Sequence, residues 1–183
     1  MDYTILVNKD NPVSRAHIPN NLVPAESKYK DNIYIDKKVK ESFDRLKKDA
    51  LKREYEIDIV SGYRDYDYQE KIYNKLVEEK GFTYAITRIA KPGTSEHQTS
   101  LALDFCIYQD EKCYIEHEVE NMPATKWIHH NAHKYGFIVR YPEGKEDITK
   151  YAYEPWHLRY VGPLALQLYQ KNITLEEYYI NKN

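Results

Sequence analysis

Apolar residues at helical spacing predict the first helix of this chain. Val39, Phe43, Leu46 and Ala50 are separated by four, three and four positions, with lysines between them. This pattern is typical of an amphipathic helix with a solvated outer face, here over 36–54. Capping residues and helix-stopping glycines predict helices at 66–80 and 123–135. Two short helices are expected to close the chain, at 163–170 and 174–180.

Short apolar runs predict strands at 3–7, 57–63, 101–108, 137–141 and 156–161. Residues 10–34 hold three of the eight prolines and show little periodicity, so we expect residues 1–34 to form an extended arm. Because helices and strands follow no regular βαβ order, the predicted fold class is α+β, with a small, mainly antiparallel sheet flanked by helices. A length of 183 residues predicts one domain, 1–183, with the arm packed on it.

Charge and composition exclude several classes of partner. The formal net charge is −2, so we expect neither nucleic acid nor an anionic membrane surface as a partner. No apolar run reaches the roughly 18–20 residues that span a bilayer, and the N-terminus shows no signal-peptide pattern. We therefore expect a cytoplasmic protein, or an exported or anchored one if a leader has been removed. Cys106 and Cys113 form no CxxC pattern and are expected to be free thiols.

The stretch SEHQTSLALDF, residues 95–105, contains the first candidate metal ligands. Asp104 lies between Leu103 and Phe105 in a predicted apolar strand. A carboxylate buried there needs a partner, which is either an arginine or a metal ion. His97 precedes the strand and is the second candidate ligand. One histidine and one aspartate alone are weak evidence for a metal site.

The stretch YEPWHLRYV, residues 153–161, contains a second pair of such residues. Glu154 and His157 flank Pro155 and Trp156, and the proline prevents a regular helix. A catalytic zinc site keeps three protein ligands and one open position, and it needs a nearby carboxylate for proton transfer. The alternative is an edge turn in which Trp156 only packs.

A third segment, SGYRDYDYQ at 61–69, adds a cation and an amide. Arg64 follows a glycine turn, and its guanidinium can hold a carboxylate or a developing oxyanion. Gln69 lies one helical turn further on and is expected to reach the same cleft. The alternative for Arg64 is an exposed surface side chain.

Other candidate sites are weaker. His129 and His133 have i,i+4 spacing, but His130 occupies the position where an HExxH site needs glutamate. We expect that helix to be a solvated surface. No serine lies in a G-x-S-x-G elbow, which argues against a serine hydrolase.

Together, the three segments resemble the zinc D-alanyl-D-alanine peptidases of the VanX, VanY and VanXY group. This group shares its fold with the lysostaphin and hedgehog metallopeptidase-like domains. The family pattern S-x-H-x-x-G-x-A-x-D is met by Ser95, His97, Ala102 and Asp104, and the later E-x-x-H by Glu154 and His157. The runs SGYR, PGTSEHQ and KYGFIVRYPEGKEDIT also match.

The resemblance implies a role for each candidate residue. His97, Asp104 and His157 would bind Zn²⁺, and Glu154 would be the general base and acid. Arg64 would stabilise the oxyanion of the tetrahedral intermediate. The substrate-binding residues would be Gln69, Ser95, Ser61 and Trp156, with Gln69 and Ser95 holding the terminal carboxylate.

The resemblance further implies a zinc D,D-carboxypeptidase, closest to VanXY, that removes C-terminal D-Ala from peptidoglycan precursors in glycopeptide resistance or cell-wall remodelling. Some dipeptide-cleaving relatives have Asp where this chain has Ser61, so carboxypeptidase activity is expected more than cleavage of D-Ala-D-Ala. The alternatives are an L,D-carboxypeptidase acting on tetrapeptides and a catalytically silent metal-binding module. The expected partner is a small peptide, and the expected assembly is a monomer or a homodimer.

Two positions depart from the family pattern. Ser100 replaces the glycine between the histidine and the aspartate, and Lys150 replaces a later glycine before a tyrosine. If the backbone at the position of the family glycine has positive φ, Ser100 is expected to destabilise the fold by about 1 kcal/mol or more.

Overall fold

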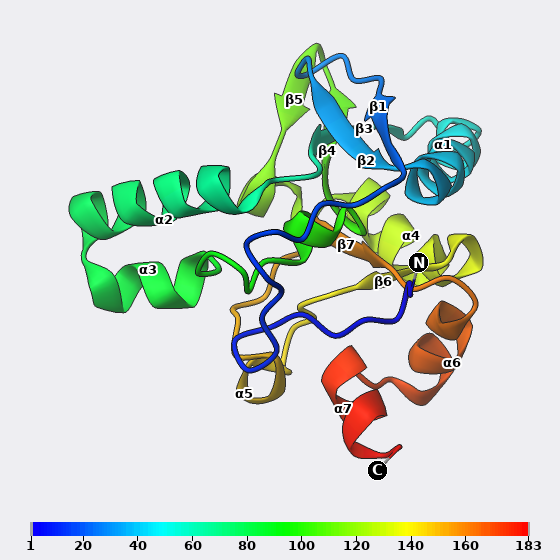
Figure 1. The fold of residues 1–183 in the computed structure, drawn as a ribbon. Coiled ribbons are helices and arrows are strands. Elements are labelled where there is room, and N and C mark those ends of the chain that lie inside the picture. The colour runs from blue at the N-terminus through cyan, green and yellow to red at the C-terminus, as the bar shows by residue number, and fades with distance from the viewer. Residues whose placement is uncertain (1, 183) are drawn as a thin grey trace.

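The computed structural model describes residues 2–182, and its antiparallel sheet with flanking helices confirms the α+β prediction (Figure 1). The larger sheet has the strand order β3–β4–β7–β6, and β5 pairs with β4. A separate two-stranded sheet pairs β1 with β2. The strands are β1 Leu22–Ala25, β2 Ile33–Asp36, β3 Glu56–Ser61, β4 Ala102–Gln109, β5 Lys112–Tyr114, β6 Phe137–Val139 and β7 His157–Tyr160.

The helices agree with most of the predicted ranges. The α-helices are α1 Lys37–Leu51, α2 Tyr66–Lys80, α3 Phe82–Arg88, α4 Pro123–Asn131, α5 Glu146–Thr149, α6 Leu164–Lys171 and α7 Leu175–Ile180. The 3-10 helices are η1 Glu96–Thr99, η2 Glu116–Val119 and η3 Ala132–Tyr135. Helices α2 and α3 form a hairpin that projects from the rest of the molecule (Figure 1). Within residues 2–182, no helix is both long and apolar enough to cross a membrane.

The predicted strand at residues 3–7 was wrong. Residues 3–7 form no strand, because their carbonyl groups bind side chains instead of a strand partner. Arg159 Nη2 donates to the carbonyls of Tyr3 and Ile5 at 3.1 and 2.7 Å. The predicted arm also contains β1 and the beginning of β2, although Pro24 interrupts the apolar pattern in β1. The short elements α3 and β5 were not predicted either.

One face of the larger sheet packs against α1 and α4 and forms the main core. The four apolar residues that predicted α1 are all buried in this core. Because side chains alternate along a strand, Leu103 and Phe105 of β4 enter the core and Asp104 points to the opposite face. Leu158 of β7 likewise enters the core, which turns His157 to the face that carries Asp104.

The register of the sheet places four polar residues in one row across that face. Asp104 pairs directly with His157 on one side and with Ser61 on the other. Arg140 continues the row beside β7, where its N–H donates to the His157 carbonyl at 3.2 Å. Cross-strand partners have Cβ atoms only about 4.5–5.5 Å apart, so the sheet itself brings Asp104 and His157 together.

Both departures from the family pattern lie at left-handed backbone positions. Ser100 ends η1 with φ 61° and ψ 10°, and it is fully buried. Lys150 ends α5 with φ 64° and ψ 16°. Glycine adopts this conformation without a steric penalty, whereas a residue with Cβ does not.

Ser100→Gly is therefore expected to raise the free energy of unfolding by about 1 kcal/mol, with zinc binding unchanged. Chemical denaturation measures the first quantity and a chelator competition the second. Two exposed lysines at helix C-caps provide a matched control, since Lys150 has positive φ and Lys52 has φ −62°. Lys150→Gly should stabilise the fold and Lys52→Gly should destabilise it. Destabilisation by Ser100→Gly would contradict the strain argument.

Candidate metal centre and peptide-binding cleft

Three side chains converge above the polar row. His97 comes from η1, and Asp104 and His157 come from β4 and β7. Asp104 Oδ2 lies 3.3 Å from His97 Nε2, and Asp104 Oδ1 lies 3.1 Å from His157 Nδ1. One ligand atom from each residue lies within 4.8 Å of the other two. The structure therefore brings together the three predicted metal ligands.

The hydrogen bonds of His97 leave one ring nitrogen available for a metal. Its Nδ1 lies 2.6 Å from the Gly62 carbonyl oxygen, which can only accept, so Nδ1 carries the proton. Its Nε2 is buried and, like Asp104 Oδ1, has no hydrogen-bond partner in residues 2–182. Two imidazole nitrogens and a carboxylate oxygen form a donor set that suits Zn²⁺ and leaves a fourth position open.

Gly62 allows the carbonyl group to approach His97. A Cβ at this position would lie 2.5 Å from the Tyr34 carbonyl oxygen and 2.7 Å from Ile35 Cγ2. These distances are too short for any side chain, because the backbone of β2 cannot easily move. The glycine of the SGYR segment therefore helps to fix the orientation of the first histidine ligand.

Glu154 lies beside this centre, in the turn before β7. Its Oε2 is 3.6 Å from His157 Nδ1, and its backbone N–H donates to the Tyr141 carbonyl at 3.1 Å. Burial raises the pKa of the Glu154 carboxyl to about 7, although His157 opposes this increase. A carboxyl group with this pKa can both accept and release a proton near neutral pH.

Two of the candidate metal ligands, Asp104 and His157, have pKa values that neighbouring charged groups shift against the effect of burial. Burial alone would raise the pKa of Asp104, but His97 and His157 hold it well below its usual range. Burial alone would lower the pKa of His157, but the nearby carboxylates of Asp104 and Glu96 raise it to about 9. A metal ion bound at Nδ1 of His157 must therefore displace a proton.

The predicted cation also reaches the site. The backbone N–H of Arg64 donates to the His97 carbonyl at 3.2 Å. In its side chain, Nη1 donates to Ser61 Oγ at 3.4 Å. Arg64 Nε has no partner in the described part of the chain. Arg64 and Trp156 line the cleft, and the Trp156 ring packs edge-on against His117 at 4.7 Å between ring centroids.

The two predicted carboxylate-binding residues differ in position. Ser95 lines the pocket, and its Oγ accepts from the His97 N–H at 3.3 Å, which leaves its own hydroxyl proton free to be donated. Gln69 is 0% exposed and does not line the pocket. Its Nε2 donates to the Ala90 carbonyl at 2.7 Å, so it supports the pocket wall from behind.

The candidate metal ligands open into a two-part cleft. A pocket of about 220 Å³ adjoins His97, Asp104, Glu154 and His157. A groove of about 680 Å³ meets it and has four lining residues in common with it: Arg64, Asp104, Glu116 and Trp156. The pocket also has lining residues that no motif predicted individually: Leu76, Arg88, Ile89, Ala90, Glu116, Tyr141 and Tyr151. The tyrosines lie in or beside the run KYGFIVRYPEGKEDIT, which was the only available signal.

The helix with paired histidines is not a second metal site. It was expected to be solvated, but His129 is half-buried, and its Nε2 lies 2.8 Å from the Pro155 carbonyl oxygen. His133 stacks on Tyr169 with ring centroids 3.8 Å apart. His129 therefore supports the turn that carries Glu154.

Cys106 and Cys113 are both free, as predicted.

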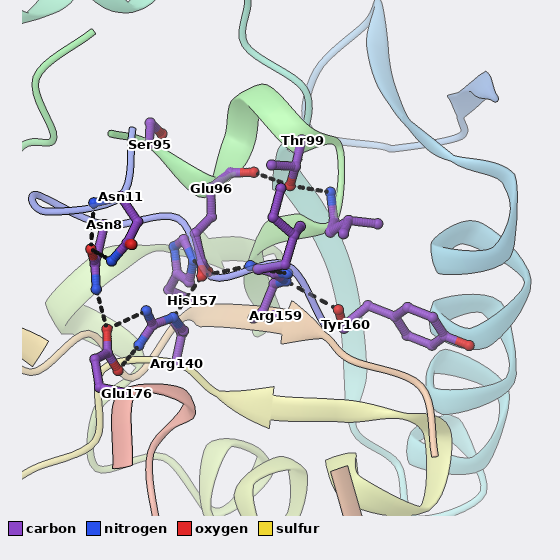
Figure 2. A network of polar contacts seen from close by, with 12 residues as sticks. Asn8, Asn11, Ser95, Glu96, Thr99, Arg140, His157, Arg159, Tyr160 and Glu176 are labelled. Carbon is purple, nitrogen blue, oxygen red and sulfur yellow. Dashed lines mark hydrogen bonds and ion pairs between the residues drawn. The ribbon is translucent and has the colours of Figure 1, made fainter. Parts of the chain in front are cut away.

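Glu96, the residue before the first histidine ligand, has a contact with the site that the sequence did not predict. Its Oε2 lies 3.7 Å from His157 Nε2, on the side of the ring away from Asp104. Burial opposes ionisation, but Arg140 and Arg159 hold the pKa of Glu96 well below its usual range. Figure 2 shows Glu96 between these arginines and His157.

Comparison with known proteins identifies relatives that cover nearly all of this chain. The chain is 46% identical over 181 residues to the putative carboxypeptidase YodJ of Bacillus subtilis, covering 95% of this chain and 66% of that protein. It superposes on the LD-carboxypeptidase LdcB with a TM-score of 0.88 and 42% identity, covering 95% of this chain and 84% of LdcB.

A second solved structure is the D,D-pentapeptidase VanY from the VanB-type resistance cassette, in complex with Zn(II). It matches with a TM-score of 0.83 and 32% identity, covering 98% of this chain and 99% of that one. The family model VanY, D-alanyl-D-alanine carboxypeptidase, matches residues 32–163. The chain belongs to the VanY family of D-alanyl-D-alanine carboxypeptidases.

Proposed function

We propose that this chain is a zinc carboxypeptidase that releases C-terminal D-Ala from peptidoglycan peptides. One observation carries the proposal. Buried atoms without partners, His97 Nε2 and Asp104 Oδ1, face His157 at the base of a pocket that also holds Glu154. Family membership and the zinc complex of the VanY relative give independent support.

The site residues would divide the reaction between them. His97, Asp104 and His157 would hold Zn²⁺, which supplies Lewis-acid polarisation of water and of the scissile carbonyl group. Glu154 would take the proton of the attacking water and deliver it to the leaving amine, as its pKa of about 7 permits. The Arg64 guanidinium, with its unpaired Nε, would stabilise the developing oxyanion.

The two parts of the cleft suit the two ends of such a substrate. A pocket of about 220 Å³ is smaller than typical ligand pockets of about 300–1,000 Å³, so it suits a single terminal residue. Ser95 and Arg88 line it and would bind the terminal carboxylate. The groove of about 680 Å³ would hold the rest of the peptide.

Two bond types are candidates. The D,D bond of a pentapeptide is the one that the motifs imply, and it is the bond we propose first. The L,D bond of a tetrapeptide is the second candidate, because the chain is 42% identical to an LD-carboxypeptidase with a TM-score of 0.88.

The proposed function is tested by measuring D-Ala release from tetrapeptide, pentapeptide and D-Ala-D-Ala in parallel. We expect release from a stem peptide, abolished by a chelator and restored by zinc. The dipeptide should be the poorest substrate. Preference for the tetrapeptide would replace the D,D assignment with the L,D one. Zinc binding without release from any peptide would establish a catalytically silent metal-binding module instead.

A further inference from the structure

His157 lies between carboxylates on both sides of its ring. Its Nδ1 faces Asp104 Oδ1 at 3.1 Å and Glu154 Oε2 at 3.6 Å. Its Nε2 faces Glu96 Oε2 at 3.7 Å, and neither of these two atoms has a hydrogen-bond partner among residues 2–182. The first side of the ring belongs to the proposed metal centre, whereas the second side lies inside the protein.

Glu96 has little freedom to move away from His157. Its side chain is fully buried, and its Oε1 accepts from Arg140 Nε at 2.7 Å and from Arg159 Nη1 at 2.6 Å. Because both arginines bind the same oxygen, the second oxygen remains directed at the histidine. Figure 2 shows this arrangement, with Arg159 approaching Glu96 from β7 and Arg140 from the position directly after β6.

Both arginines are themselves fixed by the ends of the chain. Arg140 donates two hydrogen bonds, at 2.9 and 2.6 Å, to Glu176 of α7, and Asn8 Nδ2 donates to Glu176 at 3.1 Å. Arg159 donates to two carbonyl groups in residues 3–5. Segments from the N-terminus and the C-terminus therefore determine where the Glu96 carboxylate lies.

We propose that Glu96 is a positioning residue that keeps a proton on His157 Nε2 and thereby presents Nδ1 to the metal. This inference rests on the proposed zinc site. A neutral imidazole carries one proton, and the hydrogen bond at one nitrogen decides which nitrogen can bind a metal. A carboxylate only accepts hydrogen bonds, so Glu96 selects the tautomer that leaves Nδ1 free.

Glu96→Gln reverses this preference with almost no change in shape. The two arginines need an acceptor, so the amide oxygen will face them and the amide NH₂ will face His157. An NH₂ group donates, which favours the proton on Nδ1, where the metal should bind. Loss of such an outer contact typically weakens metal binding about 10–100-fold.

The test is a chelator-competition measurement of zinc affinity on the folded full-length protein. We expect Glu96→Gln to raise the Kd for zinc about 10–100-fold. Glu176→Gln is the matched control, because it removes a charge from the same network without facing His157. It should lower stability and leave the zinc Kd within about threefold of wild type. Equal zinc affinity in wild type and Glu96→Gln would overturn the positioning role alone.

A spectroscopic measurement on the wild-type protein provides the second test and needs no variant to fold. In ¹¹³Cd-loaded, ¹⁵N-labelled protein, we expect cadmium–nitrogen coupling to Nδ1 of His157 and to Nε2 of His97. Coupling to Nε2 of His157 would overturn the proposal even if the metal site is real. Failure of the wild-type protein to bind zinc or cadmium would overturn both this proposal and the proposed function.

Discussion

Replacing Glu154 with glutamine is expected to lower kcat for D-Ala release by about 10³-fold while the zinc affinity stays near that of wild type. The amide has the same size as the carboxyl group but cannot accept a proton from water. Glu154 is separate from the three residues that form the candidate metal site, so the metal should remain bound. Single-turnover kinetics and a zinc titration of the same preparation measure the two quantities.

Glu116 is the matched control for this experiment. It also lines the pocket, but it is exposed and is assigned no proton-transfer role. Glu116→Gln should change kcat much less than Glu154→Gln does. A Glu154→Gln variant that retains more than about a tenth of the wild-type kcat would contradict the assignment of Glu154 as the base, since general catalysis typically contributes 10²–10⁴-fold.

Asp104 is the metal ligand that the sequence marks most clearly, because it breaks an apolar pattern. Asp104 interrupts a strand whose neighbours Leu103 and Phe105 are buried, and such an acid needs a partner. The pairing of Asp104 with His157 depends on strand register, which the sequence does not state. In the structure, Leu103 pairs with Leu158 directly beside the pair Asp104 and His157. The packing of the two leucines in the core therefore also aligns the two metal ligands.

The contact of Glu96 with His157 could not be predicted from the local sequence, because its partners come from distant elements. Arg140 and Arg159 lie in the apolar runs FIVRY and WHLRYV, and both side chains are buried. By the argument used for Asp104, each arginine should have indicated a buried acid. Which acid it is depends on the path of η1 over the sheet. The helical spacing between Arg64 and Gln69 was likewise not enough to place the Gln69 side chain, which lies behind the pocket wall rather than in the pocket.

The error at residues 3–7 has a related cause. An apolar run predicts burial, but the structure of the segment depends on which partner satisfies its backbone groups. Here the partner is the Arg159 side chain, together with Tyr179 Oη, which donates to the Thr4 carbonyl at 2.7 Å. The N-terminal segment is therefore ordered without pairing with a strand.

Loss of Arg140 should strongly destabilise the fold. Arg140→Met is expected to lower the free energy of unfolding by about 3–5 kcal/mol, because a buried ion pair then loses one partner. Glu96 would retain Arg159, and Glu176 would retain only Asn8 among its present side-chain partners. For a chain of this size, the melting temperature should fall by roughly 10 °C. Thermal and urea unfolding measure these effects.

Two further variants test whether the loss of stability comes from the buried charge network or from removing any arginine. Arg45 lies exposed on α1, so Arg45→Met should change stability by less than about 0.5 kcal/mol. Glu176→Gln should destabilise the wild-type protein more than it destabilises Arg140→Met, because the charge it removes is already unpaired in that background. Equal effects in the two backgrounds would show that Arg140 and Glu176 act independently. The C-terminal helix would then not be coupled to the strand beside the metal ligands.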